Sequence, residues 1–184
     1  MLAYSSIAHA GFLLTGVIAL NQEGLKASLF YLASYGIATI GAFAIVTLVR
    51  DSSGEVGDLN RWVGLGKRSP AMALIFSLFL LSFAGIPLTA GFIGKFTIFT
   101  AAYESGNIAV VVAGVLSSAI AAFFYIRVIV MIFFTDPEED TVTVTIPSLY
   151  TNLTIWIAAL ATLALGIFPA PFLDFIATFA TFTR

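Results

Sequence analysis

The chain has 184 residues, of which 60% are hydrophobic and 10% are charged, and its mean hydropathy is +1.04. A water-soluble domain has about half apolar and about a quarter charged residues, so this composition excludes that class and indicates an integral membrane protein. The formal net charge of −2, without dense basic clusters, argues against nucleic acid as a partner, and the lack of cysteine excludes disulfides and cysteine-bound iron–sulfur clusters in this chain.

Apolar runs of about 20 residues predict five transmembrane helices. In chain order, the predicted spans are residues 1–20, 26–49, 70–103, 108–134 and 153–168. We therefore expect an all-α integral membrane fold in which residues 1–184 form one transmembrane domain. Residues 50–69 are a polar connector with a short helix around residues 59–63, and residues 136–147 form an acidic loop whose alternating part is too short to predict a strand. Residues 170–184 are expected to form an aromatic-rich interfacial tail.

The third span is too long to be one straight helix. Residues 70–103 would measure about 51 Å at about 1.5 Å per residue, whereas the hydrocarbon core of a bilayer is about 30 Å thick. Pro87 lacks a backbone N–H and clashes with the preceding turn, and Gly85 and Gly91 flank it, so we predict a helix break near Pro87. The carbonyl of Phe83 then loses its helical partner and needs another donor.

A lone lysine, Lys95, follows this break inside the apolar run. A cation in the bilayer costs roughly 2.5–3.5 kcal/mol on insertion scales, so such a residue is either functional or an interfacial anchor. In the first interpretation, Lys95 gains and loses its charge and thereby carries a proton. In the second, the side chain snorkels to the outer interface. Tyr103 lies about 12 Å further along the helix, which a lysine stem covers only in part, and this favours the first interpretation.

His9, the only histidine, lies near the middle of the first span. Histidine titrates near neutral pH, which suits a proton relay, but a neutral histidine bonded to a neighbouring helix fits the pattern equally well. With no cysteine or carboxylate near it in sequence, it does not predict a metal site. Arg127 cannot release its proton in practice, so it either acts as an electrostatic partner of other groups or snorkels to the cytoplasmic surface.

No aspartate or glutamate falls inside a predicted span, and Glu104 lies at an edge. Buried charges are paired or neutralised, so intramembrane cations without an acid form an incomplete electrostatic set. We therefore expect a partner, or a further part of the same protein, to supply carboxylates. Small residues recur along the second and fourth spans and indicate close helix packing: Ala33, Ser34, Gly36, Ala38, Gly41, Ala113, Gly114, Ser117, Ser118 and Ala121.

Lysines and arginines in short loops predict the orientation of the chain. The side with the amino terminus and the two polar connectors carries Arg50, Arg61, Lys67 and Arg68. The opposite side carries Lys26 and Arg184. We therefore expect the amino terminus in the cytoplasm and the carboxyl terminus outside.

Three motifs resemble the antiporter-like membrane subunits of respiratory complex I. Residues 3–12 (AYSSIAHAGF) resemble the motif that opens an interior helix, and residues 85–96 (GIPLTAGFIGKF) are similar to a later broken helix. Residues 124–128 (FYIRV) are similar to the aromatic–arginine motif of the helix after it. The combination of His9 and Lys95 most resembles subunit N, the bacterial counterpart of mitochondrial subunit 2, and the resemblance extends over essentially the whole chain.

This resemblance implies proton translocation coupled to electron transfer from NADH to quinone in a bacterial inner membrane. Lys95 would correspond to the broken-helix lysine of an outer half-channel, and His9 would lie on the central hydrophilic axis. The chain itself would bind no cofactor, because NADH, flavin, iron–sulfur clusters and quinone would belong to other subunits.

The family normally continues upstream of the first motif, so the resemblance implies that this chain is the carboxyl-terminal portion of a longer subunit. The expected partners are the amino-terminal part of that subunit, other complex I membrane subunits and the lipid bilayer. Two alternatives stay open: a subunit of a multisubunit sodium/proton antiporter, which uses the same fold, and a structural fragment that packs in a membrane assembly without conducting.

Overall fold

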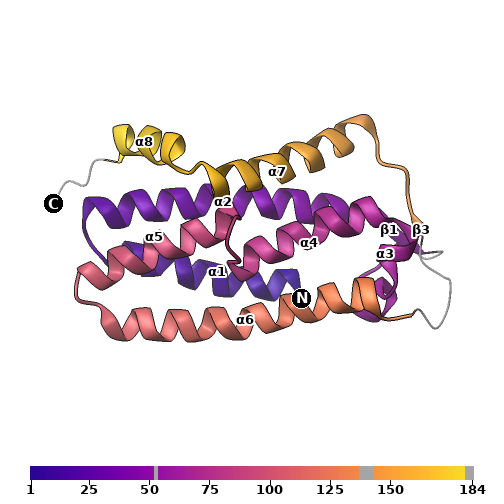
Figure 1. The fold of residues 1–184 in the computed structure, drawn as a ribbon, viewed down its shortest axis with the longest axis horizontal. Coiled ribbons are helices and arrows are strands. Elements are labelled where there is room, and N and C mark those ends of the chain that lie inside the picture. Colours follow the sequence, from indigo (N-terminus) through magenta and orange to yellow (C-terminus); the bar gives the residue numbers. More distant parts are fainter. Residues whose placement is uncertain (52–53, 137–142, 181–184) are drawn as a thin grey trace.

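The computed structural model describes residues 1–51, 54–136 and 143–180. Its long helices run along one common direction, and a small sheet lies at one end of the bundle (Figure 1). In chain order, the apolar helices are α1 (Leu2–Val17), α2 (Gln22–Val46), α4 (Pro70–Ala84), α5 (Ala90–Glu104), α6 (Ile108–Phe134), α7 (Leu149–Ile167) and α8 (Ala170–Phe179). The predicted all-α membrane fold is confirmed.

Among the described residues, three helices, α2, α6 and α7, are long and apolar enough to cross a membrane. α4 and α5 follow one another along the bundle and together form the predicted third span (Figure 1). α1 has 16 residues, about 24 Å, because the chain leaves the helix after Val17 and Leu20 adopts a φ of 50°. The predicted number of five spans is therefore approximate: three are complete helices, one is divided and one is short.

α2 lies against five neighbours, α1, α4, α5, α7 and α8. A small residue makes this packing close, because Gly41 lies against the Phe79 ring of α4 and Ala158 of α7. α6 packs mainly on α4 and buries only three of its 27 residues. The exposed apolar surface of α6 therefore suits contact with lipid or with further protein segments.

The third span is divided as predicted near Pro87. α4 ends at Ala84, Gly85 adopts a left-handed φ of 81°, and α5 begins only at Ala90. The Gly85 N–H donates to the Leu81 carbonyl at 3.0 Å and closes the last turn of α4. Glycine suits this position because a Cβ strains the left-handed conformation.

Close backbone packing holds the two halves of the broken helix together. The Gly91 N–H of α5 donates to Ser82 Oγ of α4 at 3.1 Å, and a Cβ at Gly91 would collide with the Ser82 carbonyl oxygen. Gly166 of α7 lies equally close to the backbone of the break at Leu88. The break is therefore a tightly packed part of the bundle.

The sheet at the end of the bundle consists of the antiparallel strands β1 (Val49–Asp51), β2 (Gly54–Glu55) and β3 (Thr143–Val144), in the order β2-β1-β3. The prediction that the second helix extends to residue 49 was wrong, because α2 ends at Val46 and Val49 pairs with Val144. β3 was not predicted, because a strand of two residues depends on a partner that lies far away in the sequence.

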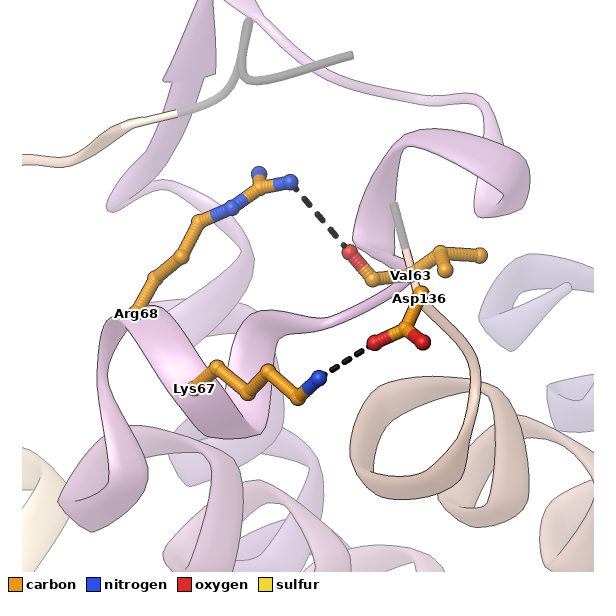
Figure 2. Close-up of polar contacts among 4 residues, drawn as sticks. All are labelled: Val63, Lys67, Arg68 and Asp136. Carbon is orange, nitrogen blue, oxygen red and sulfur yellow. Dashed lines mark hydrogen bonds and ion pairs between the residues drawn. The ribbon is translucent and has the colours of Figure 1, made fainter. Parts of the chain in front are cut away.

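The connector that precedes α4 contains η1 (Leu59–Trp62), which confirms the predicted short helix, and α3 (Leu65–Arg68). Figure 2 shows that Lys67 of α3 forms an ion pair with Asp136, just after α6, while Arg68 Nη2 donates to the Val63 carbonyl at 3.4 Å. The hydrogen bond and charge of Lys67 hold the pKa of Asp136 below its ordinary value. Because Lys67 and Asp136 are both exposed, the ion pair itself adds little stability.

We predict that Gly91→Ala destabilises the fold, because the added methyl group pushes α5 away from the Ser82 backbone. Overpacking of this kind costs roughly 1–3 kcal/mol. Thermal unfolding of the purified protein in lipid nanodiscs measures the loss as a lower Tm. Gly36→Ala in α2 is the matched control, because no atom lies within 4 Å of its added Cβ. Equal Tm values for the two variants would contradict the role assigned to Gly91.

Candidate functional site

Lys95 lies in the second turn of α5, just after the helix break in sequence, and the residue is only 4% exposed. Its Nζ donates to the Phe83 carbonyl at 2.8 Å, to the Ala84 carbonyl at 3.2 Å and to Ser118 Oγ at 2.8 Å. These three acceptors match the three N–H groups of an ammonium ion. Within the described residues, no carboxylate contacts the amine, so all of its hydrogen-bond acceptors are neutral oxygens.

The break supplies two of these three acceptors. The last carbonyls of a helix have no N–H partner within the helix, and they carry the partial negative charge of its carboxyl end. The carbonyl of Phe83, which was expected to need a new donor, receives it from Lys95. A Cβ at Gly85 would lie 2.9 Å from Lys95 Cδ, so the glycine also leaves the space through which the lysine stem passes.

His9 lies on α1, is 3% exposed and is bonded through both ring nitrogens. Its Nδ1 lies 2.6 Å from the Tyr31 hydroxyl of α2, and its Nε2 lies 3.1 Å from the Tyr125 hydroxyl of α6. The ring also stacks on Tyr35, with ring centres 4.4 Å apart. A neutral imidazole has one donor and one acceptor, so it donates to one tyrosine and accepts from the other.

The structure brings His9 and Lys95 into the same buried region, where the Phe12 ring lies close to both. Lys95 Nζ lies 4.6 Å from the centre of the Phe12 ring, and the His9 ring centre lies 5.8 Å from that same ring. The Phe83 ring centre is 5.4 Å from that of His9. Among the described hydrogen bonds, none joins His9 directly to Lys95.

Arg127 is not part of this buried region. It lies on the exposed side of α6 and lines an open groove together with Met1 and Asp58. Two residues away, Tyr125 points the other way, into the bundle, where it reaches His9. The structure therefore places Arg127 at the surface of the bundle.

Four residues of the site were not predicted to be site residues from the sequence: Tyr31, Tyr125, Ser118 and Phe12. The two tyrosines carried a usable signal, because a tyrosine in the middle of an apolar helix needs a hydrogen-bond partner. The hydroxyl of Ser118 carried no such signal, since serine among other small residues is usual where helices pack closely. Among the described residues, no group of three or more His, Cys, Asp or Glu side chains lies together as a metal site would require.

Comparison with known proteins identifies relatives that are much longer than this chain. The chain is 56% identical over 184 residues to NADH-quinone oxidoreductase subunit N of Rhodococcus opacus, covering 100% of this chain and 34% of that relative. It is 58% identical over 184 residues to NADH-quinone oxidoreductase subunit N 3 of Streptomyces griseus, covering 100% of this chain and 33% of that relative. The chain therefore spans about a third of the length of the curated relatives that it matches.

Solved structures share the same arrangement of helices. A chain of respiratory complex I from Thermus thermophilus matches with a TM-score of 0.81 at 33% identity, covering 94% of this chain and 38% of that chain. A chain of the Mrp complex from Dietzia matches with a TM-score of 0.78 at 21% identity, covering 97% of this chain and 41% of that chain, and this match shows the common fold alone.

The family model described as NADH:quinone oxidoreductase/Mrp antiporter, TM matches residues 1–121, which contain α1, the broken helix and the first part of α6. Both Lys95 and His9 lie inside the matched segment. The chain belongs to the NADH:quinone oxidoreductase/Mrp antiporter transmembrane family and is a multi-pass membrane protein.

Proposed function

We propose that this chain forms part of the proton translocation path in subunit N of a proton-pumping NADH–quinone oxidoreductase. The observation that carries the proposal is the buried Lys95 amine at a helix break, surrounded by three neutral oxygens. The identity of 56–58% with relatives named subunit N supports the same function.

Neutral acceptors allow the charge of Lys95 to be reversible. A buried carboxylate partner would hold the ammonium ion firmly, because loss of either charge would leave the other unpaired in an apolar environment. Carbonyl and hydroxyl oxygens hold it less firmly, and a neutral amine still donates to two of them. Lys95 is therefore the proton carrier of the proposed path.

His9 is the second proposed station of this path. Each of its ring nitrogens lies within hydrogen-bond distance of a tyrosine hydroxyl, which both donates and accepts, so either tautomer of the ring keeps two hydrogen bonds once the hydroxyls reorient. No described hydrogen bond joins it to Lys95, and the Phe12 ring lies close to both groups. Proton transfer between the two stations therefore requires bridging water molecules or a movement of side chains.

Arg127 is proposed as an electrostatic partner at the mouth of the path, because its guanidinium keeps its proton. It lines the groove with Asp58 at the amino-terminal end of α1. Basic residues of the connector 50–69 favour the cytoplasm for this end of the bundle, in a bacterial inner membrane, with the carboxyl terminus outside.

Redox chemistry takes place elsewhere in the proposed assembly. NADH, flavin, iron–sulfur clusters and quinone are assigned to other subunits, since this sequence has no cysteine to ligate a cluster. The partners of the chain are the amino-terminal part of the same subunit, other membrane subunits of the complex and lipid. The largely exposed α6 offers apolar surface for such contacts.

A sodium/proton antiporter subunit is the alternative function, because the family includes both classes. A chimera in which this chain replaces the matching third of the Rhodococcus opacus subunit N distinguishes them in inside-out vesicles. Acidification of the vesicle lumen on addition of NADH supports the proposed function. Exchange of sodium for protons under an imposed gradient, without any response to NADH, supports the antiporter.

We predict that Lys95→Ala in this chimera lowers NADH-driven proton uptake about tenfold or more, because the path loses its carrier. Quenching of a pH-sensitive dye by inside-out vesicles gives the uptake, and gel electrophoresis of the complex gives the amount assembled. Lys67→Ala is the matched control, since that lysine is exposed and lies in the connector. Normal pumping by an assembled Lys95→Ala complex would show that the chain packs in the assembly without conducting.

A second substitution distinguishes a relay from a structural role for His9. Glutamine keeps a donor and an acceptor for the two tyrosines but cannot carry a proton. We predict that His9→Gln assembles normally and pumps about tenfold less than the unaltered chimera. If His9→Gln pumps normally and His9→Ala fails to assemble, His9 acts as a hydrogen-bonded link between helices.

A further inference from the structure

Ser118 is the only side chain among the three hydrogen-bond acceptors of Lys95. Its Oγ lies 2.8 Å from Nζ and belongs to α6, whereas the other two acceptors are backbone carbonyls at the end of α4. Ser118 is half-buried, and its neighbour Ser117 is exposed on the same helix. The lysine amine thus joins α5 to two other helices, and the link to α6 depends on one hydroxyl.

The two kinds of acceptor respond differently when the amine changes its protonation. An ammonium ion has three N–H groups to donate, and a neutral amine has two N–H groups and one lone pair. A carbonyl oxygen can only accept, so the Phe83 and Ala84 carbonyls can serve the two remaining N–H groups of the neutral amine. A hydroxyl can accept or donate, so Ser118 can reverse its hydrogen bond and donate to the lone pair.

We propose that Ser118 is a positioning residue for Lys95: its hydroxyl accepts from the ammonium ion and donates to the neutral amine, so that both protonation states keep three hydrogen bonds. This inference rests on the proposed function, because it concerns the same amine acting as a proton carrier. The proton lost by Lys95 goes to the path and not to Ser118, whose O–H bond remains intact in both states.

Three substitutions of Ser118 in the chimera separate this role from simple packing. Alanine and valine remove the hydroxyl, whereas threonine keeps it and adds a methyl group, as valine does. If the hydroxyl acts as proposed, Ser118→Thr pumps nearly as well as serine, whereas Ser118→Ala and Ser118→Val both pump about tenfold less. A loss of about tenfold is the magnitude expected when one charge-assisted hydrogen bond is removed. NADH-driven proton uptake by inside-out vesicles, normalised to assembled complex, measures each rate.

A role in packing alone predicts a different order of pumping rates. If only the small size of Ser118 matters, Ser118→Ala pumps like serine, while Ser118→Thr and Ser118→Val are impaired together, and this result would overturn the proposal. Equal rates for all variants would also overturn it. Ser117→Ala is the matched control on the neighbouring exposed position, and it is expected to pump normally.

The Lys95→Ala chimera separates this inference from the proposed function. If Lys95→Ala stops pumping and the Ser118 variants do not follow the hydroxyl, the inference fails and the proton-carrier role stands. If Lys95→Ala itself pumps normally, the proposed function fails, and the role of Ser118 fails with it.

Discussion

The contact between the Lys95 amine and the last carbonyls of α4 is the interaction on which the site depends. A buried carbonyl without a donor, or a buried ammonium ion without acceptors, costs about 1–3 kcal/mol or more. Here each satisfies the other, because Lys95 donates to the carbonyls of Phe83 and Ala84. The glycine at position 85 ends the helix and leaves room for the lysine stem, so the break and the lysine depend on each other.

α2 and α6 connect this contact to the rest of the site. Tyr31 of α2 bonds His9, and its ring lies so close to Gly94 that a Cβ there would be 2.6 Å from it. α6 contributes Tyr125 to His9 and Ser118 to Lys95, although most of its surface is exposed. Because one helix touches both titratable groups through hydroxyls, a displacement of α6 relative to α1 and α5 changes both hydrogen bonds together.

The sequence predicts the parts of this structure that follow from local physical rules. Span length, the missing N–H of Pro87 and the cost of a cation in lipid are enough to predict the broken helix and to select Lys95. These rules act along the chain, so they cannot show which helices meet. The pairing of His9 with Tyr125 crosses most of the sequence, and so does the pairing of Val49 with Val144 that ends α2 early. Ser118 was predicted only as a packing residue because its hydroxyl gains a role from Lys95 on another helix.

A permanently charged side chain at position 95 shows whether proton translocation needs a charge that Lys95 can gain and lose. Arginine keeps the cation and can donate to the α4 carbonyls, but it cannot release its proton. We predict that a chimeric complex with Lys95→Arg assembles and shows no NADH-driven proton uptake beyond that of Lys95→Ala. Proton uptake by Lys95→Arg at the rate of the unaltered chimera would contradict it, because a fixed charge at the helix break would then be sufficient.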